Sequence, residues 1–386
     1  MRITMVLGTD YLLPVLDGRV AREAAALHSA GHQVTVICWA RSASGELVDG
    51  PVEEVVNNVQ IHRIFSPVST ADAPLPKRII QHIQAKRRLA HVLHKIDTDA
   101  IHFHDLDTAV ITLLQPPKQP WVYDSHEDYA GMVSHLPWPL PRLASFLERL
   151  VVRRANGVIT VSSHILRRLA RYGARRRLLV LNAHDPAHFI TDGNPAILRE
   201  AWGVGPEDLI ILYVGSLGPG RSILEAIEAV EQRPGTRLIL GGHGMWTRKV
   251  EQSVMKARHT VFLGPVPSEE LPNMFAASDI ILGVRDPAIP DHAVAMPNKL
   301  FEAAVAGRPL LAAKGTLVGK IVSQKELGEL VEYGNVESMV AALDVLADPV
   351  VRQTYGSNGL RLSVGRLGWR WQAQKLQYLY QNLDKK

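Results

Sequence analysis

The chain has 386 residues, of which 46% are hydrophobic and 21% are charged, and its formal net charge is +5. This length and composition predict a folded protein of two ordinary domains and exclude a disordered or fibrous chain. The single cysteine, Cys38, excludes an internal disulfide, and no apolar run approaches the length of a membrane span, so we expect a cytoplasmic protein.

The positive charge is concentrated in the first half of the chain. Residues 1–190 carry 22 Lys and Arg against 17 Asp and Glu, which accounts for the whole net charge, and ten arginines but one acid, Glu148, lie between Arg142 and Arg177. Such a stretch attracts polyanions. The apolar segment 135–140, which includes Trp138, favours an anionic inner membrane surface, and no nucleic-acid-binding motif occurs. A solvated helix face is the equally weighted alternative.

In chain order, the first half alternates short apolar runs with segments of helical periodicity. The runs are strand candidates, and they lie at residues 3–7, 33–38, 100–103, 121–123, 158–161 and 178–181, with helices predicted at 20–30, 79–94 and 142–154. The Asp-x-Asp sequence of Asp105 and Asp107 resembles a metal motif, but two aspartates after a strand are ordinary turn chemistry. We therefore expect no metal and no cofactor.

The same alternation restarts in the second half, after a turn-rich stretch near residues 185–205. Strands are predicted at residues 209–214, 237–240, 260–263, 280–283 and 310–312, and a last helix at 369–383 is expected to bury Trp371, Leu376, Leu379, Tyr380 and Leu383. Alternation of this kind predicts parallel sheets with crossover helices, and the restart predicts two of them. Because ligands bind at the carboxyl ends of such strands, we expect the site in a cleft between the two sheets.

A helix without a capping side chain is predicted where Pro297, Asn298 and Lys299 follow the small residues 293–296. Pro297 suits a first turn, and the free N–H groups behind it favour an anion such as phosphate, beside the charge of Lys299. Glu302 lies four residues beyond Asn298, about 6 Å along the axis, where a carboxylate can accept the hydroxyls of a ribose. The alternative to a bound anion is that water occupies the helix start and that Glu302 forms a surface pair with Lys299.

Two strand-to-glycine turns support the phosphate interpretation. The first runs from Gly215 and Ser216 to Arg221, and the second contains Gly242 and Gly244. Glycine allows a ligand to approach the backbone closely, and the fork of Arg221 suits phosphate oxygens. Each loop alone is weak support, because any tight turn uses glycine.

These motifs together resemble family 4 glycosyltransferases, in the order GSLGPGR, GGHG, VFLGPVP and PNKLFEAAVAGRPLLA. The first half agrees through DGRV at 17–20, IHFHDLD at 101–107, YDSHEDY at 123–129 and VLNAHDPAHF at 180–189. The resemblance implies the GT-B fold, with an acceptor-side domain at 1–190, a donor-binding domain at 191–365 and a helix at 366–386 that returns to the first domain. It also implies a retaining hexosyltransferase.

The resemblance assigns roles to residues in both halves. It implies that Glu302 binds the ribose, that Arg221, Lys299 and the helix amides bind the diphosphate, and that Leu263 to Val266 lie near the base. His126 matches the histidine beside the donor sugar. The remaining expected contacts are Gly215, Ser216, Gly242, Gly244 and Asn298 toward the donor, and Gly18, Arg19, His104, Asp105 and Glu127 on the acceptor side.

Two positions depart from the family pattern. A glutamate is common eight residues before the ribose glutamate, but Val294 stands there, as in a Pro-Asn-Lys subset of the family, and Gly215-Ser216 replaces the usual Gly-Arg pair. The expected partners are a nucleoside diphosphate sugar, UDP-linked, and a saccharide or lipid-linked acceptor. A nucleotide-sugar epimerase and a non-catalytic nucleotide-sugar-binding protein are the alternatives.

Overall fold

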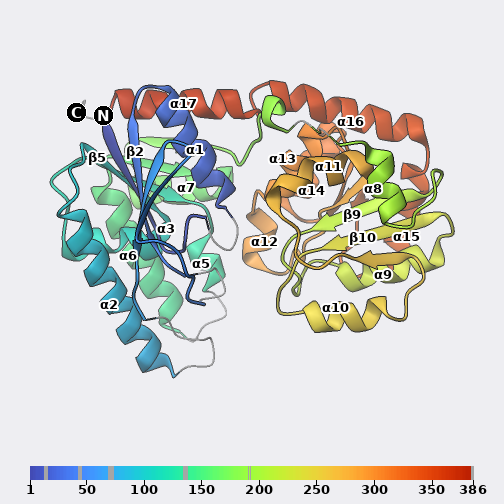
Figure 1. The fold of residues 1–386 in the computed structure, drawn as a ribbon, viewed down its shortest axis with the longest axis horizontal. Coiled ribbons are helices and arrows are strands. Elements are labelled where there is room, and N and C mark those ends of the chain that lie inside the picture. The colour runs from blue at the N-terminus through green and yellow to red at the C-terminus, as the bar shows by residue number, and fades with distance from the viewer. Residues whose placement is uncertain are drawn as a thin grey trace. The chain divides into compact units, whose positions relative to one another are not determined.

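The computed structural model describes residues 1–12, 16–41, 46–67, 74–133, 138–189, 191 and 193–383. The chain divides into two compact units, each with its own sheet. Unit 1 comprises residues 1–180 and those from 373 onward, and unit 2 comprises residues 181–372. Figure 1 shows the chain, coloured from blue at the N-terminus to red at the C-terminus.

Unit 1 is built on an eight-stranded sheet with the order β3-β4-β2-β1-β5-β6-β7-β8. Its strands are β1 (Arg2–Leu7), β2 (Gln33–Trp39), β3 (Glu53–Val56), β4 (Val59–Ile64), β5 (Ala100–His104), β6 (Trp121–Ser125), β7 (Gly157–Thr160) and β8 (Arg177–Leu179). Its helices are α1 (Gly18–Ser29), α2 (Leu75–Leu93), α3 (Asp105–Ala109), α4 (Ile111–Leu114), α5 (Tyr129–Met132), α6 (Leu140–Arg154) and α7 (Ser163–Tyr172).

The parallel crossover pattern predicted for this half is confirmed, with one exception at the sheet edge. β3 pairs antiparallel with β4, and Asn57 and Asn58 both take positive φ in the turn between them. Neither strand was predicted, because polar residues interrupt the apolar pattern of this hairpin. α2 and α6 lie on one face of the sheet, and α1 lies on the other (Figure 1).

Unit 2 is built on a six-stranded sheet with the order β11-β10-β9-β12-β13-β14. Its strands are β9 (Leu209–Val214), β10 (Thr236–Gly241), β11 (Thr260–Phe262), β12 (Ile280–Leu282), β13 (Leu310–Ala313) and β14 (Leu330–Val331), and all pairings are parallel. Its helical segments are η1 (Pro186–His188), α8 (Pro195–Ala201), α9 (Ile223–Gln232), α10 (Thr247–Val254), η2 (Ser268–Glu270), α11 (Leu271–Ala277), α12 (Pro290–Val294), α13 (Asn298–Val305), α14 (Leu317–Lys325), α15 (Val336–Leu346) and α16 (Pro349–Val364).

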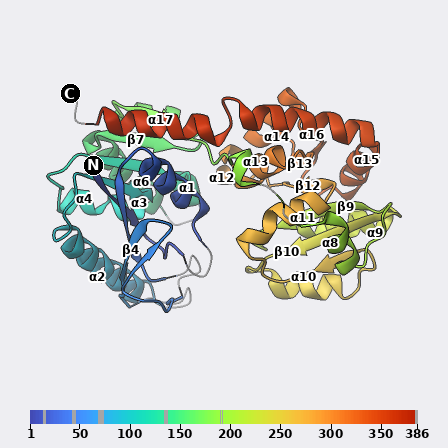
Figure 2. The same ribbon diagram turned by 45° about the horizontal axis from the view of Figure 1, so that its top comes forward.

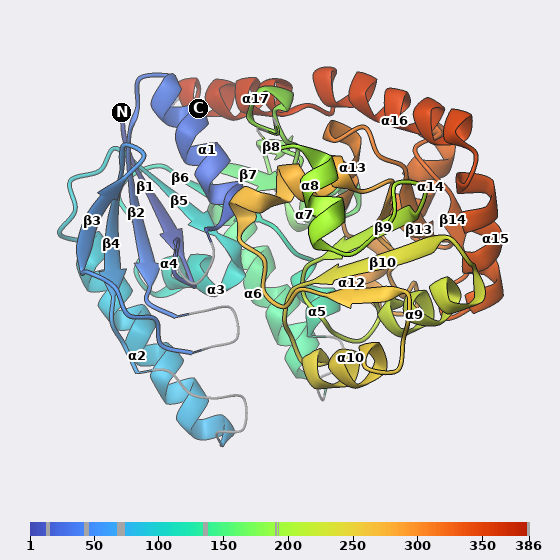
Figure 3. The ribbon, with the colours of Figure 1, turned by 45° about the vertical axis from the view of Figure 1, so that its right-hand side comes forward.

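The core of unit 2 explains why its strands were predictable. Ile211, Leu240, Leu282 and Leu311 are fully buried between the strands and the helices α9 and α15, so the strands read as continuous apolar runs. Figure 3 shows the sheet with α9 and α15 beside it. β14 was not predicted, because it has two residues and no periodicity.

The last helix, α17 (Trp369–Gln381), runs from unit 2 into unit 1 along the chain. Figure 2 shows it above β7, and Leu379 packs on Gly157 of that strand. The predicted apolar face is correct at Leu376, Leu379, Tyr380 and Leu383, which are buried, but wrong at Trp371, which is 45% exposed. Trp369 is buried instead, because it shares the helix face of residues 372, 376 and 380.

Among the residues that the structure describes, no helix has both the length and the apolar character needed to cross a bilayer.

Candidate active site

The start of α13 has no side-chain cap, as the sequence predicted. Pro297 occupies the N-cap position with extended backbone, and no side chain of the described residues accepts a hydrogen bond from the first helical amides. The preceding residues differ from the prediction of a loop, since Ala293 and Val294 close the short helix α12. Asn298, exposed, opens the helix, so its amides remain available to an anion.

Lys299 reaches from α13 to the end of β9. Its ammonium donates to the carbonyl oxygen of Val214, lies 4.7 Å from the ring centre of Tyr213, and lies 3.3 Å from where a Cβ on Gly215 would stand. Burial lowers the pKa of Lys299 to about 8, and the charges of Arg285 and Arg221 act in the same direction while Glu302 opposes them. The predicted Gly215 turn and the predicted lysine are therefore neighbours.

Arg221 and Arg285 follow the two strands where the order of the sheet reverses. β9 and β12 are adjacent, but their crossover connections go to opposite edges, and Arg221 follows β9 while Arg285 follows β12. Burial lowers the pKa of His292 to about 4, and the charges of Arg285 and Arg221 add to this effect. Such a switch point is where open α/β sheets bind their ligands.

Arg285 and His292 were not predicted as site residues. Arg285 lies two residues beyond the end of the predicted strand 280–283, so the rule that ligands bind at carboxyl strand ends could have indicated it. His292 gave no signal in the sequence, because it lies on α12, a helix that the apolar pattern did not predict. Its side chain lies 2.8 Å from where a Cβ on Gly220 would stand.

The glycines of the two predicted turns support one another through backbone contacts. Gly242 has φ +127, and a Cβ there would lie 1.8 Å from the carbonyl oxygen of Gly215. Gly244 has φ +157, and its Cβ would lie 2.3 Å from the carbonyl oxygen of Leu217. These glycines are thus required by loop packing, and they fix the shape of the turn that faces Lys299. Ser216 is exposed on that turn.

The remaining donor-side predictions fall at neighbouring strand ends of unit 2. Leu263 is 37% exposed directly after β11, and Val266 packs over Gly241 at the end of β10. Glu302 is 8% exposed, and its carboxylate lies 3.9 Å from Nε2 of His184. The position of Glu302, one turn into α13, matches the prediction, and His184 is a neighbour that the sequence did not reveal.

A second cluster of polar side chains is buried in unit 1. His126 follows β6, and its Nε2 lies 3.0 Å from Oδ2 of Asp124 and 3.1 Å from Nδ1 of His104. Its backbone amide donates to Oδ1 of Asp105 at 3.0 Å, and its Nδ1 lies 3.6 Å from Oδ2 of the same carboxylate. Three predicted site residues, His104, Asp105 and His126, therefore meet at one place.

The predicted Arg19 belongs to the same cluster from the opposite side. It is 5% exposed and donates from Nε to Asp124 at 3.1 Å, from a terminal nitrogen to Asp124 at 2.8 Å, and to the carbonyl of Val180 at 3.0 Å. Its guanidinium also pairs with Glu23 at 2.9 Å. These contacts direct Arg19 into the interior of unit 1.

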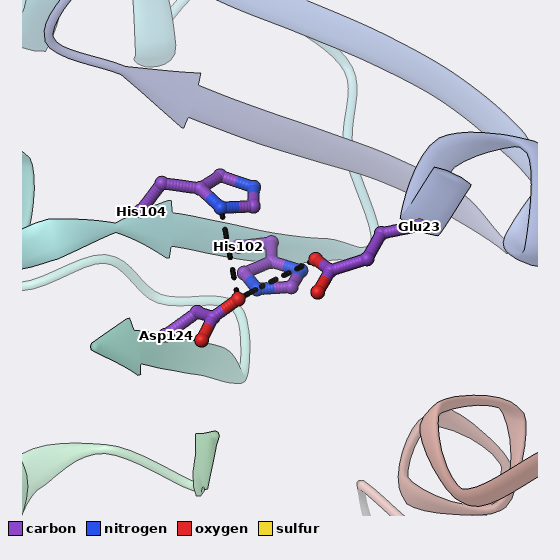
Figure 4. A group of neighbouring side chains, drawn as sticks. All are labelled: Glu23, His102, His104 and Asp124. Atoms are coloured by element: carbon purple, nitrogen blue, oxygen red, sulfur yellow. Dashed lines mark ion pairs between the residues drawn. The ribbon is translucent and has the colours of Figure 1, made fainter. Parts of the chain in front are cut away.

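Glu23, His102, His104 and Asp124 offer ligand atoms within 4.8 Å of one another, and all four are buried (Figure 4). However, Arg19 lies against both carboxylates, so a cationic side chain already neutralises them. Burial raises the pKa of Glu23, although Arg19 opposes the shift.

The other two residues predicted on the acceptor side are Gly18 and Glu127. Gly18 opens α1 behind Asp17, whose carboxylate caps the helix through the amides of Arg19 and Val20. Glu127 is exposed after β6. Asp124, Glu23 and His102 were not predicted; Asp124 lies two residues before His126, in the YDSHEDY segment, and a carboxylate inside a buried strand was the available signal.

Two α/β units with largely parallel sheets, the second with cationic side chains and an uncapped helix at its switch point, have the architecture of the GT-B fold. Solved structures have the same fold. Sucrose-phosphate synthase from Thermosynechococcus elongatus superimposes with a TM-score of 0.79 at 19% identity, covering 99% of both chains. Anabaena HepE, solved in complex with UDP and glucose, gives 0.74 at 16% identity with the same coverage.

Sequence comparisons give the family. Residues 19–185 match the model of Glycosyltransferase Family 4, and residues 208–348 match that of Glycosyl transferases group 1. The D-inositol 3-phosphate glycosyltransferase of Mycobacterium marinum is 23% identical over 88% of this chain and 74% of that protein. The chain belongs to glycosyltransferase family 4, and it is a glycosyltransferase that acts on nucleotide-sugar donors.

Proposed function

We propose that this protein is a retaining glycosyltransferase that moves a hexosyl unit from a UDP-linked sugar to a saccharide or lipid-linked saccharide. The observation that carries the proposal is that Lys299 lies at the Gly215 turn with Arg221 and Arg285 near enough for their charges to lower its pKa. Three cationic side chains there suit a diphosphate. The choice of UDP is supported by the fold neighbours that were solved with UDP or with UDP-glucose.

The reaction needs this charge at its leaving group. As the bond between the anomeric carbon and the phosphate breaks, the sugar gains oxocarbenium character and the leaving diphosphate gains negative charge. Lys299, Arg221 and the α13 amides would stabilise that charge, and such preorganised donors contribute most of the catalysis in many enzymes. Retention follows when the acceptor attacks from the face that the diphosphate leaves.

The remaining assignments follow from the family. Glu302 would accept hydrogen bonds from the ribose hydroxyls, and the segment from Leu263 to Val266 would lie near the base. His126 would contact the donor sugar, with His104 and Asp105 beside it. Gly18 and Glu127 stay acceptor-side proposals.

A thermal-shift panel of UDP, GDP and ADP with their sugars tests the donor assignment. A ligand at 100 times its dissociation constant stabilises by about 2.7 kcal/mol. We expect UDP and a UDP-hexose to give the largest shift. Incubation of that donor with candidate acceptors, followed by NMR of the new anomeric proton, then tests transfer with retention; an inverted product would refute the mechanism.

The same experiments separate the two rival functions. An epimerase would release UDP from the donor without joining the sugar to an acceptor. A non-catalytic binding protein, which the Val294 position would permit, would show the thermal shift but no turnover. Neither outcome is compatible with the proposed transferase.

We also propose that α6 docks unit 1 on an anionic membrane surface. The start of this helix and the turn before it carry exposed apolar side chains, Trp138 (72%), Leu140 (40%), Leu143 (50%) and Phe146 (57%). Arg142 lies 5.2 Å from the Trp138 ring centre, and Arg149 and Arg153 are also exposed. Apolar and basic side chains on one helix favour an anionic interface. Residues 135–137 of the predicted apolar stretch lie outside the described residues.

Vesicle sedimentation tests this surface. We expect binding to phosphatidylcholine vesicles that contain about one third phosphatidylglycerol, and weak binding without the anionic lipid. Trp138→Ser with Phe146→Ser should reduce binding at least about tenfold, because two large apolar side chains are lost. Ile197→Ser with Met245→Ser, which changes exposed apolar residues of unit 2, is the matched control. Equal loss in both variants would contradict the proposal.

A further inference from the structure

Both ring nitrogens of His126 face carboxylates. Nε2 lies 3.0 Å from Asp124 and Nδ1 lies 3.6 Å from Asp105, while the side chain remains 16% exposed. A neutral imidazole would turn one lone pair toward an anion. A doubly protonated ring meets both carboxylates with N–H groups, so this placement favours the imidazolium form.

The second neighbour of Nε2, His104, is also consistent with a doubly protonated His126. Nδ1 of His104 lies 3.1 Å from Nε2 of His126, so one of the two nitrogens donates. His104 is buried, and burial, together with the charges of His102 and His126, holds its pKa well below the usual range. A neutral His104 can accept at Nδ1, and the N–H at Nε2 of His126 then faces two acceptors.

Asp124 cannot turn away from His126, because Arg19 holds it from the other side. The carboxylate is fully buried on β6 and receives three hydrogen bonds from Arg19, which is itself anchored on the carbonyl of Val180. Burial would raise the pKa of Asp124, but the charges of Arg19 and His126 outweigh it and keep the carboxylate ionised. A fixed anion at this position selects both the charge and the orientation of the ring.

Asp105 completes the arrangement from the start of α3. Its φ of +63 is unusual for a residue with a side chain, and such strain persists only where surrounding contacts impose it. In this conformation its carboxylate accepts from the backbone amide of His126 and faces the ring. Asp105 thus fixes the backbone of His126 and places a second carboxylate beside its ring.

We propose that Asp124 is a positioning residue that holds His126 as an imidazolium with Nε2 directed inward and Nδ1 beside Asp105, so that the ring presents a positive charge to substrate. The proposal rests on the proposed function, in which His126 faces the donor sugar. His126 then acts as a cation and hydrogen-bond donor and does not act as a base. The acceptor oxygen bonds to the anomeric carbon, the bond to the phosphate breaks with its electron pair, and the acceptor proton passes to the departing phosphate.

The titratable and charged groups around His126 come from four elements. They are Asp124 on β6, Asp105 and Asp107 on α3, His102 and His104 on β5, and Arg19 and Glu23 on α1. Burial alone would lower the pKa of His126, but Asp124 and Asp105 outweigh burial and Arg19 and raise it to about 10. The ring should therefore keep its second proton throughout the neutral range.

The direct test is an NMR titration of the His126 ring without substrate, assigned with His126→Asn. We expect the wild-type ring to stay protonated to above about pH 8.5, and Asp124→Asn to lower its pKa by at least about 2 units, because the buried anion is lost. Asp105→Asn should lower it less. A wild-type ring that titrates between about pH 6 and 7, or an unchanged pKa in the Asp124 variant, overturns the proposal.

Because this titration needs no nucleotide, failure of the donor assignment would leave its result intact. The role in catalysis is tested by kcat against pH. Asp124→Asn should reduce kcat at least about tenfold at pH 9 but less than about threefold at pH 6, where its His126 regains the proton. Asp10→Asn, which removes a buried carboxylate from the buried Arg63 outside the His126 cluster, is the matched control and should give a loss independent of pH. A loss of kcat in the Asp124 variant that does not depend on pH would show that Asp124 has only a structural role.

Discussion

Replacing Lys299 by Met should stabilise the unliganded protein and weaken nucleotide binding. The lowered pKa of Lys299, about 8 against the usual 10.5, means that its charged form is held at a cost in free energy. This shift corresponds to about 3 kcal/mol, which solvent screening of a partly exposed ammonium reduces to about 2 kcal/mol. Loss of the hydrogen bond to Val214 offsets about 1 kcal/mol of the gain.

The sign of the pH dependence follows from the same pKa. The unfolded chain binds more protons than the folded one between pH 8 and 10.5, so the free energy of unfolding of the wild type rises over this window. Lys299→Met should lack that rise. At pH 7 we expect its Tm to be higher by about 2–4 °C, the effect of about 1 kcal/mol in a domain of this size.

Nucleotide binding should change in the opposite direction. A charged hydrogen bond to phosphate contributes about 1.5–3 kcal/mol, so affinity for the preferred nucleotide should fall about 10- to 150-fold. At a concentration that stabilises the wild type by about 2.7 kcal/mol, a variant weakened about 30-fold gains only about 0.9 kcal/mol. Differential scanning fluorimetry with and without UDP measures both effects, and Lys314→Met, at an exposed lysine of the same unit, is the control. A lower Tm without ligand, or an undiminished ligand shift, would refute the reasoning.

Three further predictions concern single positions. Glu302→Gln should weaken nucleotide binding at least about tenfold by calorimetry, because a neutral amide binds ribose hydroxyls less strongly, and unchanged affinity would remove Glu302 from the site. Gly242→Ala should destabilise unit 2 by more than about 3 kcal/mol, because its Cβ would meet the Gly215 carbonyl at 1.8 Å, whereas Gly218→Ala, with no atom within 4 Å, should be nearly neutral in calorimetric unfolding. Cys38 should resist a thiol reagent at pH 8 and react only on unfolding, because burial and the nearby Asp10 raise the pKa of its thiol to about 12; stoichiometric labelling of the native protein would contradict this.

The elements that the sequence predicted well are those buried on both faces. The run from Leu209 to Val214 is apolar throughout, and the structure places β9 at these residues. The uncapped start at Pro297 was also predictable, because capping depends on local residue types. In contrast, the hairpin of β3 and β4 and the short helix α12 form through pairing and packing that no local pattern encodes.

The residues of the candidate site also include some that local sequence predicts and some that it does not. Lys299 and Gly215 were predicted separately from a helix start and from a turn, and their contact is a consequence of the parallel sheet. Asp124 was not predicted, since its importance depends on Arg19, which is 105 residues distant in sequence. Residue spacing can locate strand ends, but it does not reveal which buried charges neutralise one another.

The chain enters unit 2 after Val180 and leaves it before Ala373, and the two crossings lie side by side, since the amide of Leu181 donates to the side chain of Gln372 at 3.1 Å. Unit 2 is therefore an insertion within unit 1, and both chain termini belong to the host. A fragment of residues 181–372 retains its complete sheet and should fold alone as a nucleotide-binding module. A truncation before residue 373, however, would strip the host of the helix that covers β7.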